Sequence, residues 1–220
     1  MGLNNHFIII PAYNEGKNLE PVLLEVKKHA HNIVVVDDGS QDDTPKKALE
    51  VGVLVLRHRT NLGKGAALKT GCQYALEQGA EKIIVMDADG QHNPAEIPRF
   101  AAALEQHEIV FGFRTVPQSM PLVMLFGNAI LSRTLQHLYG IQVKDTQCGY
   151  RAFTSSAYPK LQWDASDYYV ETEMVVRAGK GKLKYTEIPI QTIYNDKYKG
   201  TTVLDGITIM AKMLCWRLFK

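Results

Sequence analysis

Two carboxylates and an amide stand at alternating positions near the middle of the chain. Asp87 and Asp89 are two residues apart, and Gln91 follows at the same interval. Oxygen ligands at this spacing suit one hard cation such as Mg²⁺ or Mn²⁺, and such a metal can bridge the oxygens of a diphosphate. The alternative is an acidic turn that leads into the next helix. The spacing therefore predicts a candidate metal site formed by Asp87, Asp89 and Gln91.

A second acidic pair, Asp37 and Asp38, follows a short apolar run earlier in the chain. Both carboxylates could simply be solvated in a turn. Opposite a metal site, however, one of them could accept hydrogen bonds from a nucleobase or a ribose. We assign that contact to Asp38 and expect Asp37 to support the turn.

A glycine-rich segment, Gly63-Lys64-Gly65, stands at the start of a helical pattern. It is not a phosphate loop, because that motif needs a serine or threonine directly after the lysine. It is not a dinucleotide fingerprint either, because Leu68 stands where the third glycine would be. Two alternatives remain for Lys64: a solvated side chain, or a supporting contact beside a bound nucleotide.

Short apolar runs rich in β-branched residues alternate with helical patterns in the first half of the chain. The runs are continuously apolar, which favours an α/β fold with a mostly parallel sheet and helices on both faces. Ligands of such sheets bind beyond the carboxyl ends of the strands, where the motifs above stand. The expected strands are 7–10, 33–36, 53–56, 83–86 and 109–112, and the expected helices are 18–29, 44–50, 65–78 and 94–105, the last with Asn93 as its N-cap.

The second half of the chain has a different pattern. Neither an internal repeat nor a low-complexity linker separates it from the first half, so residues 1–220 are expected to form one domain. The expected elements are a helix over 120–139, a turn-rich segment over 145–153, a helix over 169–178, a strand over 184–192, a polar loop over 194–202 and a final helix over 204–219.

Composition limits the classes of partner. The chain has 220 residues, 45% of them hydrophobic, which is enough for a sizeable core. A formal net charge of +2, with Lys and Arg spread along the chain, argues against a nucleic-acid partner. The three cysteines stand far apart, which fits neither a zinc site nor a disulfide framework and favours a cytoplasmic protein. No run reaches the ~18 uncharged apolar residues of a membrane-spanning helix.

Taken together, the motifs resemble those of the family 2 glycosyltransferases, specifically the branch of dolichol-phosphate mannose synthase and related polyprenyl-phosphate glycosyltransferases. The resemblance covers roughly residues 6–200, with the motifs in the same order and spacing. Five ordered motifs are more specific than any one of them. They are Pro11-Ala12-Tyr13-Asn14-Glu15, Val36-Asp37-Asp38-Gly39-Ser40, Asn61-Leu62-Gly63-Lys64-Gly65, Met86-Asp87-Ala88-Asp89-Gly90-Gln91 and Asp145-Thr146-Gln147-Cys148-Gly149-Tyr150-Arg151.

The resemblance implies a GT-A fold and an inverting transfer of a hexose from a nucleoside-diphosphate sugar of the GDP-mannose or UDP-glucose type. It implies Mg²⁺ or Mn²⁺ on Asp89 and Gln91, and it implies that Arg114 meets a substrate phosphate through its planar fork. Asp89 and Arg114 are the expected catalytic residues. The residues expected around the donor are Pro11, Tyr13, Glu15, Asp38, Lys64, Asp87, Ala88 and Asp89.

The acceptor decides whether the enzyme needs a base. A hydroxyl must lose its proton as it attacks, whereas a phosphate is already ionised and needs positive charge to hold it. The chain lacks the QxxRW and Glu-Asp features of processive or hydroxyl-glycosylating relatives, which favours a polyprenyl phosphate acceptor. The candidates for holding the acceptor or its phosphate are Arg114, Arg133, Arg151, Lys197 and Lys199.

Other interpretations stay open. A soluble sugar or glycan hydroxyl could be the acceptor, with Glu171 or Glu173 as base, although both stand at a helix start and could instead interact with its dipole. The chain could also be a non-catalytic nucleotide-sugar-binding or scaffold subunit. Asp145 and Arg151 could pair to brace their own turn rather than bind substrate.

Polyprenyl phosphates reside in membranes, so the protein is expected to reach a membrane surface without crossing it. Apolar helical patterns over 120–138 and 207–219 could lie in the headgroup plane or pack in the core. We expect a nucleotide-binding lobe over about 1–115, an acceptor lobe over about 116–203 and an amphipathic helix over about 204–220. The expected location is the cytoplasm, peripherally on the cytoplasmic face of a membrane, with or without a separate membrane subunit.

Overall fold

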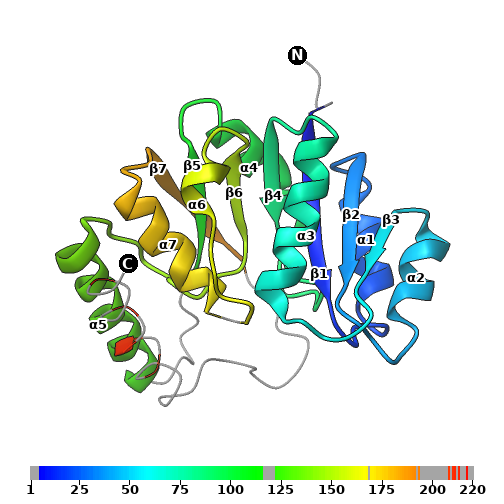
Figure 1. Ribbon diagram of the computed structural model, residues 1–220, viewed down its shortest axis with the longest axis horizontal. Helices are drawn as coiled ribbons and strands as arrows, with labels where there is room; N and C mark the ends of the chain where they lie inside the picture. Colours follow the sequence, from blue (N-terminus) through cyan, green and yellow to red (C-terminus); the bar gives the residue numbers. More distant parts are fainter. Residues whose placement is uncertain are drawn as a thin grey trace.

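A mixed sheet forms the centre of the molecule (Figure 1). The computed structural model describes residues 5–115, 122–167, 169–191, 193, 208, 210, 211, 213 and 217, without the side chains of residues 122–129. Within these residues the strand order is β3-β2-β1-β4-β6-β5-β7. The strands are β1 (His6–Ala12), β2 (Asn32–Asp37), β3 (Leu54–Arg57), β4 (Lys82–Val85), β5 (Ile109–Arg114), β6 (Arg151–Thr154) and β7 (Tyr185–Ile190).

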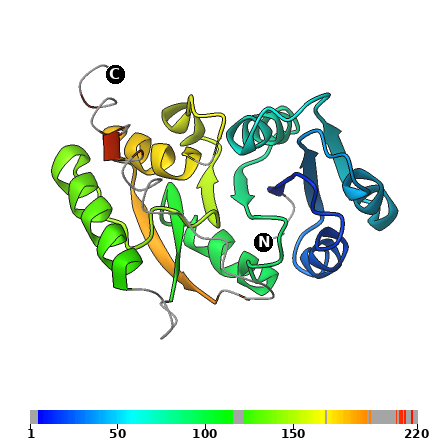
Figure 2. The ribbon, with the colours of Figure 1, turned by 90° about the horizontal axis from the view of Figure 1, so that it is seen from below.

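Helices cover both faces of the sheet, as Figures 1 and 2 show. One face packs against α3 (Lys64–Glu77), α5 (Leu122–Tyr139), α6 (Tyr158–Leu161) and α7 (Val170–Lys180). The other packs against α1 (Leu19–Val26), α2 (Thr44–Val51) and α4 (Ile97–Ala103), which follows the short 3₁₀ helix η1 (Pro94–Glu96). The predicted α/β architecture, mostly parallel with helices on both faces, is confirmed.

Strand β1 shows why these runs are apolar at every position. Successive side chains of a strand point to opposite faces, and both faces of this sheet are covered. Phe7 and Ile9 belong to the core cluster on the α3 side, whereas Ile8 and Ile10 belong to the cluster on the α1 side. Parallel pairing of β1 with β2 and β4, and of β2 with β3, confirms the parallel arrangement expected in this half. The predicted N-cap is also confirmed, because the Asn93 side chain accepts a hydrogen bond from the Ala95 N–H.

The segment 145–153 differs from the prediction, which took all of it as turn. Its last part forms β6, an antiparallel strand inserted between β4 and β5. Arg151 pairs in register with Val85 of β4 and with Phe111 of β5. A four-residue strand that begins with arginine gives little apolar periodicity, so its sequence did not reveal it. The insertion brings residues 145–150 to the carboxyl ends of β4 and β5.

The two apolar helical segments of the second half contribute to the core where they are described. Leu135 and Tyr139 of α5 are buried, and Met213, which is helical, is fully buried. The Tyr139 hydroxyl donates a hydrogen bond to the Met213 carbonyl over 2.5 Å. Among the described residues, none of the helices has the length and apolar character needed to cross a bilayer.

Candidate active site

The polar motifs gather at one edge of the sheet. Strand β1 starts near the label N in Figure 1, so the carboxyl ends of the parallel strands lie at the lower edge, and Figure 2 views the molecule from that side. Strands β1, β2, β4 and β5 all run in the same direction, so the motifs that follow them lie at this edge of the sheet. The turn before the antiparallel β6 joins them from the opposite direction. Sequence-distant motifs therefore share one rim.

Lys64 lies at the centre of this rim. Its Nζ is 2.5 Å from Asp87 Oδ1 and 2.7 Å from Glu171 Oε1, and its side chain is only 15% exposed. Burial works against its charge, yet the two carboxylates raise the pKa of Lys64 above its ordinary value. Of the two alternatives for Lys64, the solvated side chain is wrong: the ammonium is a buried, permanently charged group.

Asp87 is committed to this ion pair. Burial alone would raise its pKa, but the Lys64 ammonium, with a smaller effect of His92, holds the pKa of Asp87 at about 2. The backbone of Gly149 passes so close that a Cβ there would stand 2.6 Å from Asp87 Oδ2, so a larger residue would displace this carboxylate. Asp87 was predicted as a metal ligand; among the described residues, Lys64 is the cation nearest to it.

Asp89 and Gln91 are better placed for a metal. Both are partly exposed, and the Gln91 N–H donates to Asp89 Oδ1 over 2.9 Å, which fixes the turn. Ala88, between the two aspartates, is buried. No group of three His, Cys, Asp or Glu side chains able to hold a metal occurs within the described part of the chain. Mg²⁺, however, is commonly held by one or two carboxylates together with substrate phosphates, so the two oxygen donors fit an ion that shares a diphosphate.

His92 is buried beneath the acidic turn and binds its backbone. It was not among the site residues predicted from the sequence. Its Nδ1 accepts a hydrogen bond from the Asp87 N–H over 3.1 Å. Its ring stacks on Tyr150, and Tyr150 stacks on Phe100, at centroid distances of 5.0 and 4.4 Å. Burial lowers the pKa of His92, against the pull of Asp87 and Asp89. The only sequence signal was its place directly after Gln91.

Arg114 is held at the rim by a bidentate ion pair with Asp145. Its Nε is 2.7 Å from Asp145 Oδ2 and its Nη2 is 3.0 Å from Oδ1. Burial would raise the pKa of Asp145, but the hydrogen bonds and charge of Arg114 lower it. The alternative pairing of Asp145 with Arg151 is therefore wrong.

Arg151 braces its own turn, as the alternative to acceptor binding expected, but through backbone carbonyls rather than Asp145. It is 1% exposed, and its guanidinium donates to the backbone carbonyls of Thr146, Cys148 and Glu171. A buried guanidinium with three internal acceptors braces the turn before β6 and is not available to an acceptor phosphate. Arg133 is exposed on α5. Lys197 and Lys199 lie outside the described residues.

Asp38 is likewise buried, and its carboxylate accepts hydrogen bonds from other groups of the protein. Its Oδ1 accepts from the His58 ring over 2.7 Å and from the Leu62 N–H over 2.9 Å, and its Oδ2 accepts from the Gly63 N–H over 2.7 Å. It is 3% exposed. The carboxylate assigned to a nucleoside therefore holds the loop that leads to Lys64. The expectation for Asp37 is confirmed, because its Oδ1 accepts from the N–H of Ser40 in the same turn.

The remaining donor residues lie on the loop after β1. Tyr13 is 45% exposed, and Pro11 and Glu15 are partly exposed. The loop is tied to the next motif, because the Asn14 N–H donates to Ser40 Oγ and the Glu15 N–H donates to Thr44 Oγ1, both over 2.8 Å. These residues lie on the rim beside β2. Their direct contacts with a nucleoside stay a prediction.

The start of α3 is closed by the chain itself. The Gly65 N–H donates to the Ser166 carbonyl over 2.7 Å, and the Trp163 indole donates to the Gly65 carbonyl over 2.9 Å. The backbone before α7 thus satisfies the helix end that a phosphate would occupy in a phosphate loop. This agrees with the rejection of a phosphate loop from the sequence.

Glu173, a candidate base, fixes the same backbone. Its carboxylate accepts hydrogen bonds from the N–H groups of Asp164 and Ala165, and it pairs with Arg177 at 2.9 Å. It is 1% exposed. A carboxylate with these partners is structural, so the geometry gives no support to a general base at Glu173.

Gly65→Ala is expected to lower the free energy of unfolding by about 2 kcal/mol or more, because overpacking a tight contact is costly. A Cβ at Gly65 would stand 2.1 Å from the Ala165 carbonyl oxygen. Urea unfolding measures the loss. Gly181→Ala is the control, since its Cβ would meet nothing closer than 3.2 Å, and a change below ~1 kcal/mol is expected. Equal losses in both variants would contradict the close contact between Gly65 and the Ala165 carbonyl.

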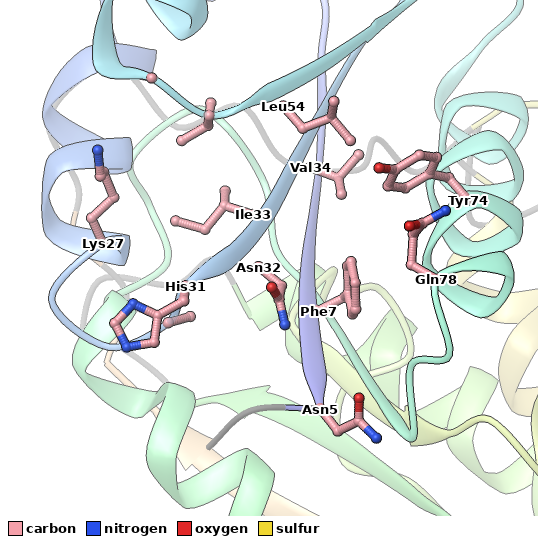
Figure 3. A pocket seen from close by; sticks show the side chains of 13 residues that line it. Asn5, Phe7, Lys27, His31, Asn32, Ile33, Val34, Leu54, Tyr74 and Gln78 are labelled. Carbon is pink, nitrogen blue, oxygen red and sulfur yellow. The ribbon is translucent and has the colours of Figure 1, made fainter. Parts of the chain in front are cut away.

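A pocket of about 480 Å³ lies at the opposite, amino-terminal edge of the sheet (Figure 3). Figure 3 shows Phe7 of β1 and Val34 of β2 in it, with Tyr74 of α3 and Gln78, which follows that helix, at one side and His31 at the other. None of the predicted site residues lines this pocket. The candidate active site is therefore the rim around Lys64, not the pocket.

Comparisons with known proteins identify the family of this chain. A family model described as Glycosyl transferase family 2 matches residues 7–161. A UDP-N-acetylglucosamine–dolichyl-phosphate N-acetylglucosaminyltransferase from Methanococcus voltae is 36% identical, covering 97% of this chain and 96% of that protein. A polyprenol monophosphomannose synthase from Mycolicibacterium smegmatis is 31% identical, covering 94% and 83%.

A solved structure shares the fold. Glucosyl-3-phosphoglycerate synthase from Mycobacterium tuberculosis, in complex with Mn²⁺, UDP and phosphoglyceric acid, matches with a TM-score of 0.76 at 18% identity. The match covers 99% of this chain and 80% of that one. It confirms the predicted GT-A fold. From the family match, the relatives and the fold together, this chain belongs to glycosyl transferase family 2 and is a glycosyltransferase.

Proposed function

We propose that this protein transfers a sugar, with inversion, from a nucleoside-diphosphate donor to a polyprenyl phosphate at a membrane surface. The observation that carries the proposal is the rim itself: two cations fixed by ion pairs, Lys64 on Asp87 and Arg114 on Asp145, share the edge of the sheet that also carries the oxygen donors Asp89 and Gln91. Such a set binds phosphate groups on both reactants. The names of the two relatives, a dolichyl-phosphate transferase and a polyprenol monophosphomannose synthase, support the same acceptor class.

For the donor, Asp89 and Gln91 would hold Mg²⁺ or Mn²⁺ against the diphosphate. When bound, the metal supplies charge stabilisation for the departing nucleoside diphosphate. The related fold was crystallised with UDP and either Mn²⁺ or Mg²⁺, which supports a divalent ion of this kind. Lys64 would contact the same phosphates with a positive charge whose position Asp87 and Glu171 fix.

For the acceptor, the available carboxylates favour a phosphate over a hydroxyl. Glu173 is fully engaged by backbone N–H groups and Arg177, and Glu171 is paired with Lys64. Neither is poised to take a proton. A phosphate monoester needs none, and Arg114, which Asp145 holds in place, would attract it through its positive charge. Lys197 and Lys199 remain proposed phosphate contacts.

A transfer assay tests the proposal. The protein is incubated with Mn²⁺, a polyprenyl phosphate in detergent and radiolabelled UDP-N-acetylglucosamine, UDP-glucose or GDP-mannose. The expected result is label that passes into organic solvent with one donor and depends on the metal. Label confined to water-soluble product would show a soluble acceptor instead. Nucleotide binding with neither transfer nor slow donor hydrolysis would indicate a non-catalytic subunit.

A further inference from the structure

We propose that Glu171 is a positioning residue that fixes the Lys64 ammonium for the donor diphosphate. The inference rests on the proposed function, because it assigns the partner of a residue on the donor side of the same rim. It gives Glu171 a role other than the general base considered from the sequence. It also explains why a residue from the second half of the chain reaches the nucleotide side.

The geometry around Lys64 is that of a tripod. An ammonium has three N–H donors. Among the described residues, its partners are Asp87 at 2.5 Å and Glu171 at 2.7 Å. The two carboxylates arrive from different elements, one after β4 and one from the first turn of α7. Two donors are thereby anchored, and the third can contact a phosphate oxygen without a change in the position of the lysine.

Glu171 is itself held firmly. Its backbone carbonyl accepts a hydrogen bond from buried Arg151. The helix macrodipole favours a carboxylate in the first turn of α7. The side chain is 7% exposed, so the surrounding protein restricts the positions that the carboxylate can adopt. Lys64 is therefore held from a rigid base, which is what pre-organised electrostatic stabilisation requires.

A purely structural role explains Glu171 poorly. Its Oε2 is buried without a hydrogen-bond partner in the described part of the chain. A buried carboxylate with an unsatisfied oxygen costs free energy, and a buried ion pair is weak evidence for stability. The arrangement is accounted for if the charge of Glu171 serves to place the charge of Lys64.

The test measures binding of UDP and of GDP, each with Mn²⁺, by calorimetry on the full chain. Glu171→Gln is expected to weaken binding of the preferred nucleotide by about tenfold, the order of a lost charge-assisted hydrogen bond. Lys64→Met should weaken it at least as much. The double variant should bind no worse than Lys64→Met alone, because Glu171 acts only through the lysine. Losses that multiply in the double variant would overturn the proposal.

Two further variants separate positioning from folding. Glu105→Gln is the matched control, since Glu105 also pairs with a lysine, Lys82, but on the exposed surface, and its affinity should be unchanged. Glu171→Asp keeps the charge on a shorter side chain and should recover part of the affinity lost in Glu171→Gln. Equal affinities for the aspartate and glutamine variants would contradict a role for the charge.

The outcome is distinguishable from that of the transfer assay, because neither acceptor nor sugar is present. Wild-type protein that binds nucleotide but transfers nothing to lipid would overturn the proposed function and leave this inference intact. Wild-type protein that binds neither nucleotide would overturn both.

Discussion

Asp89→Ala is expected to reduce metal-dependent sugar transfer by about a thousandfold, because a bound metal supplies several kcal/mol of charge stabilisation in the transition state. Asp89 is partly exposed, and its one described side-chain hydrogen bond is accepted from the Gln91 N–H. Folding should therefore change little, by less than about 1 kcal/mol. Initial rates over a Mn²⁺ titration, with urea unfolding of the same samples, measure both effects.

The conservative variant Asp89→Asn sharpens this result. It keeps the shape of the turn but removes the charge, so an intermediate rate that recovers at higher Mn²⁺ is expected. Removal of the metal with a chelator should bring the wild type down to the level of Asp89→Ala. Turnover by Asp89→Ala at the wild-type rate would eliminate Asp89 as a metal ligand.

Arg151→Met is expected to lower the free energy of unfolding by about 3 kcal/mol or more, because three buried carbonyls lose their donor. Those carbonyls belong to Thr146, Cys148 and Glu171, and the guanidinium is fully buried. The turn before β6 would lose its brace, and activity would fall with the folded fraction. Urea unfolding measures the stability.

Arg133→Met is the matched control for this change. Arg133 is exposed on α5, so the same substitution should alter stability by less than about 0.5 kcal/mol. An Arg151→Met protein of normal stability with a raised KM for polyprenyl phosphate would restore the sequence-based assignment of Arg151 to the acceptor.

The strands and the motifs that follow them could be predicted from the sequence because their signals are local. Residues 7–10, 33–36 and 83–86 are apolar at every position, which in an α/β chain means strands covered on both faces. All three lie in strands or at a strand end, and the polar residues after them meet at one rim. The N-cap at Asn93 and the turn role of Asp37 were also readable, since both depend on neighbours a few residues away.

The partners of the charged residues could not be predicted in the same way. The antiparallel β6 is too short to show a period, yet its insertion places Asp145 beside Arg114. The same packing buries Arg151. The charge of a side chain indicates which groups it can bind. Long-range topology decides whether those groups come from the protein or from the substrate, because carbonyls and carboxylates of other elements compete for the N–H donors of the same lysine or arginine.

The acidic turn at residues 87–91 shows both what the sequence determines and what it leaves to the tertiary structure. The sequence by itself determined that its oxygens stand after a buried strand, at the edge where an α/β sheet binds ligands. Only the tertiary structure divided them, giving Asp87 to Lys64 and leaving Asp89 and Gln91 at the partly exposed rim. The physical reason is distance along the chain: Lys64 and Glu171 are remote in sequence, and only the packed sheet brings them to Asp87.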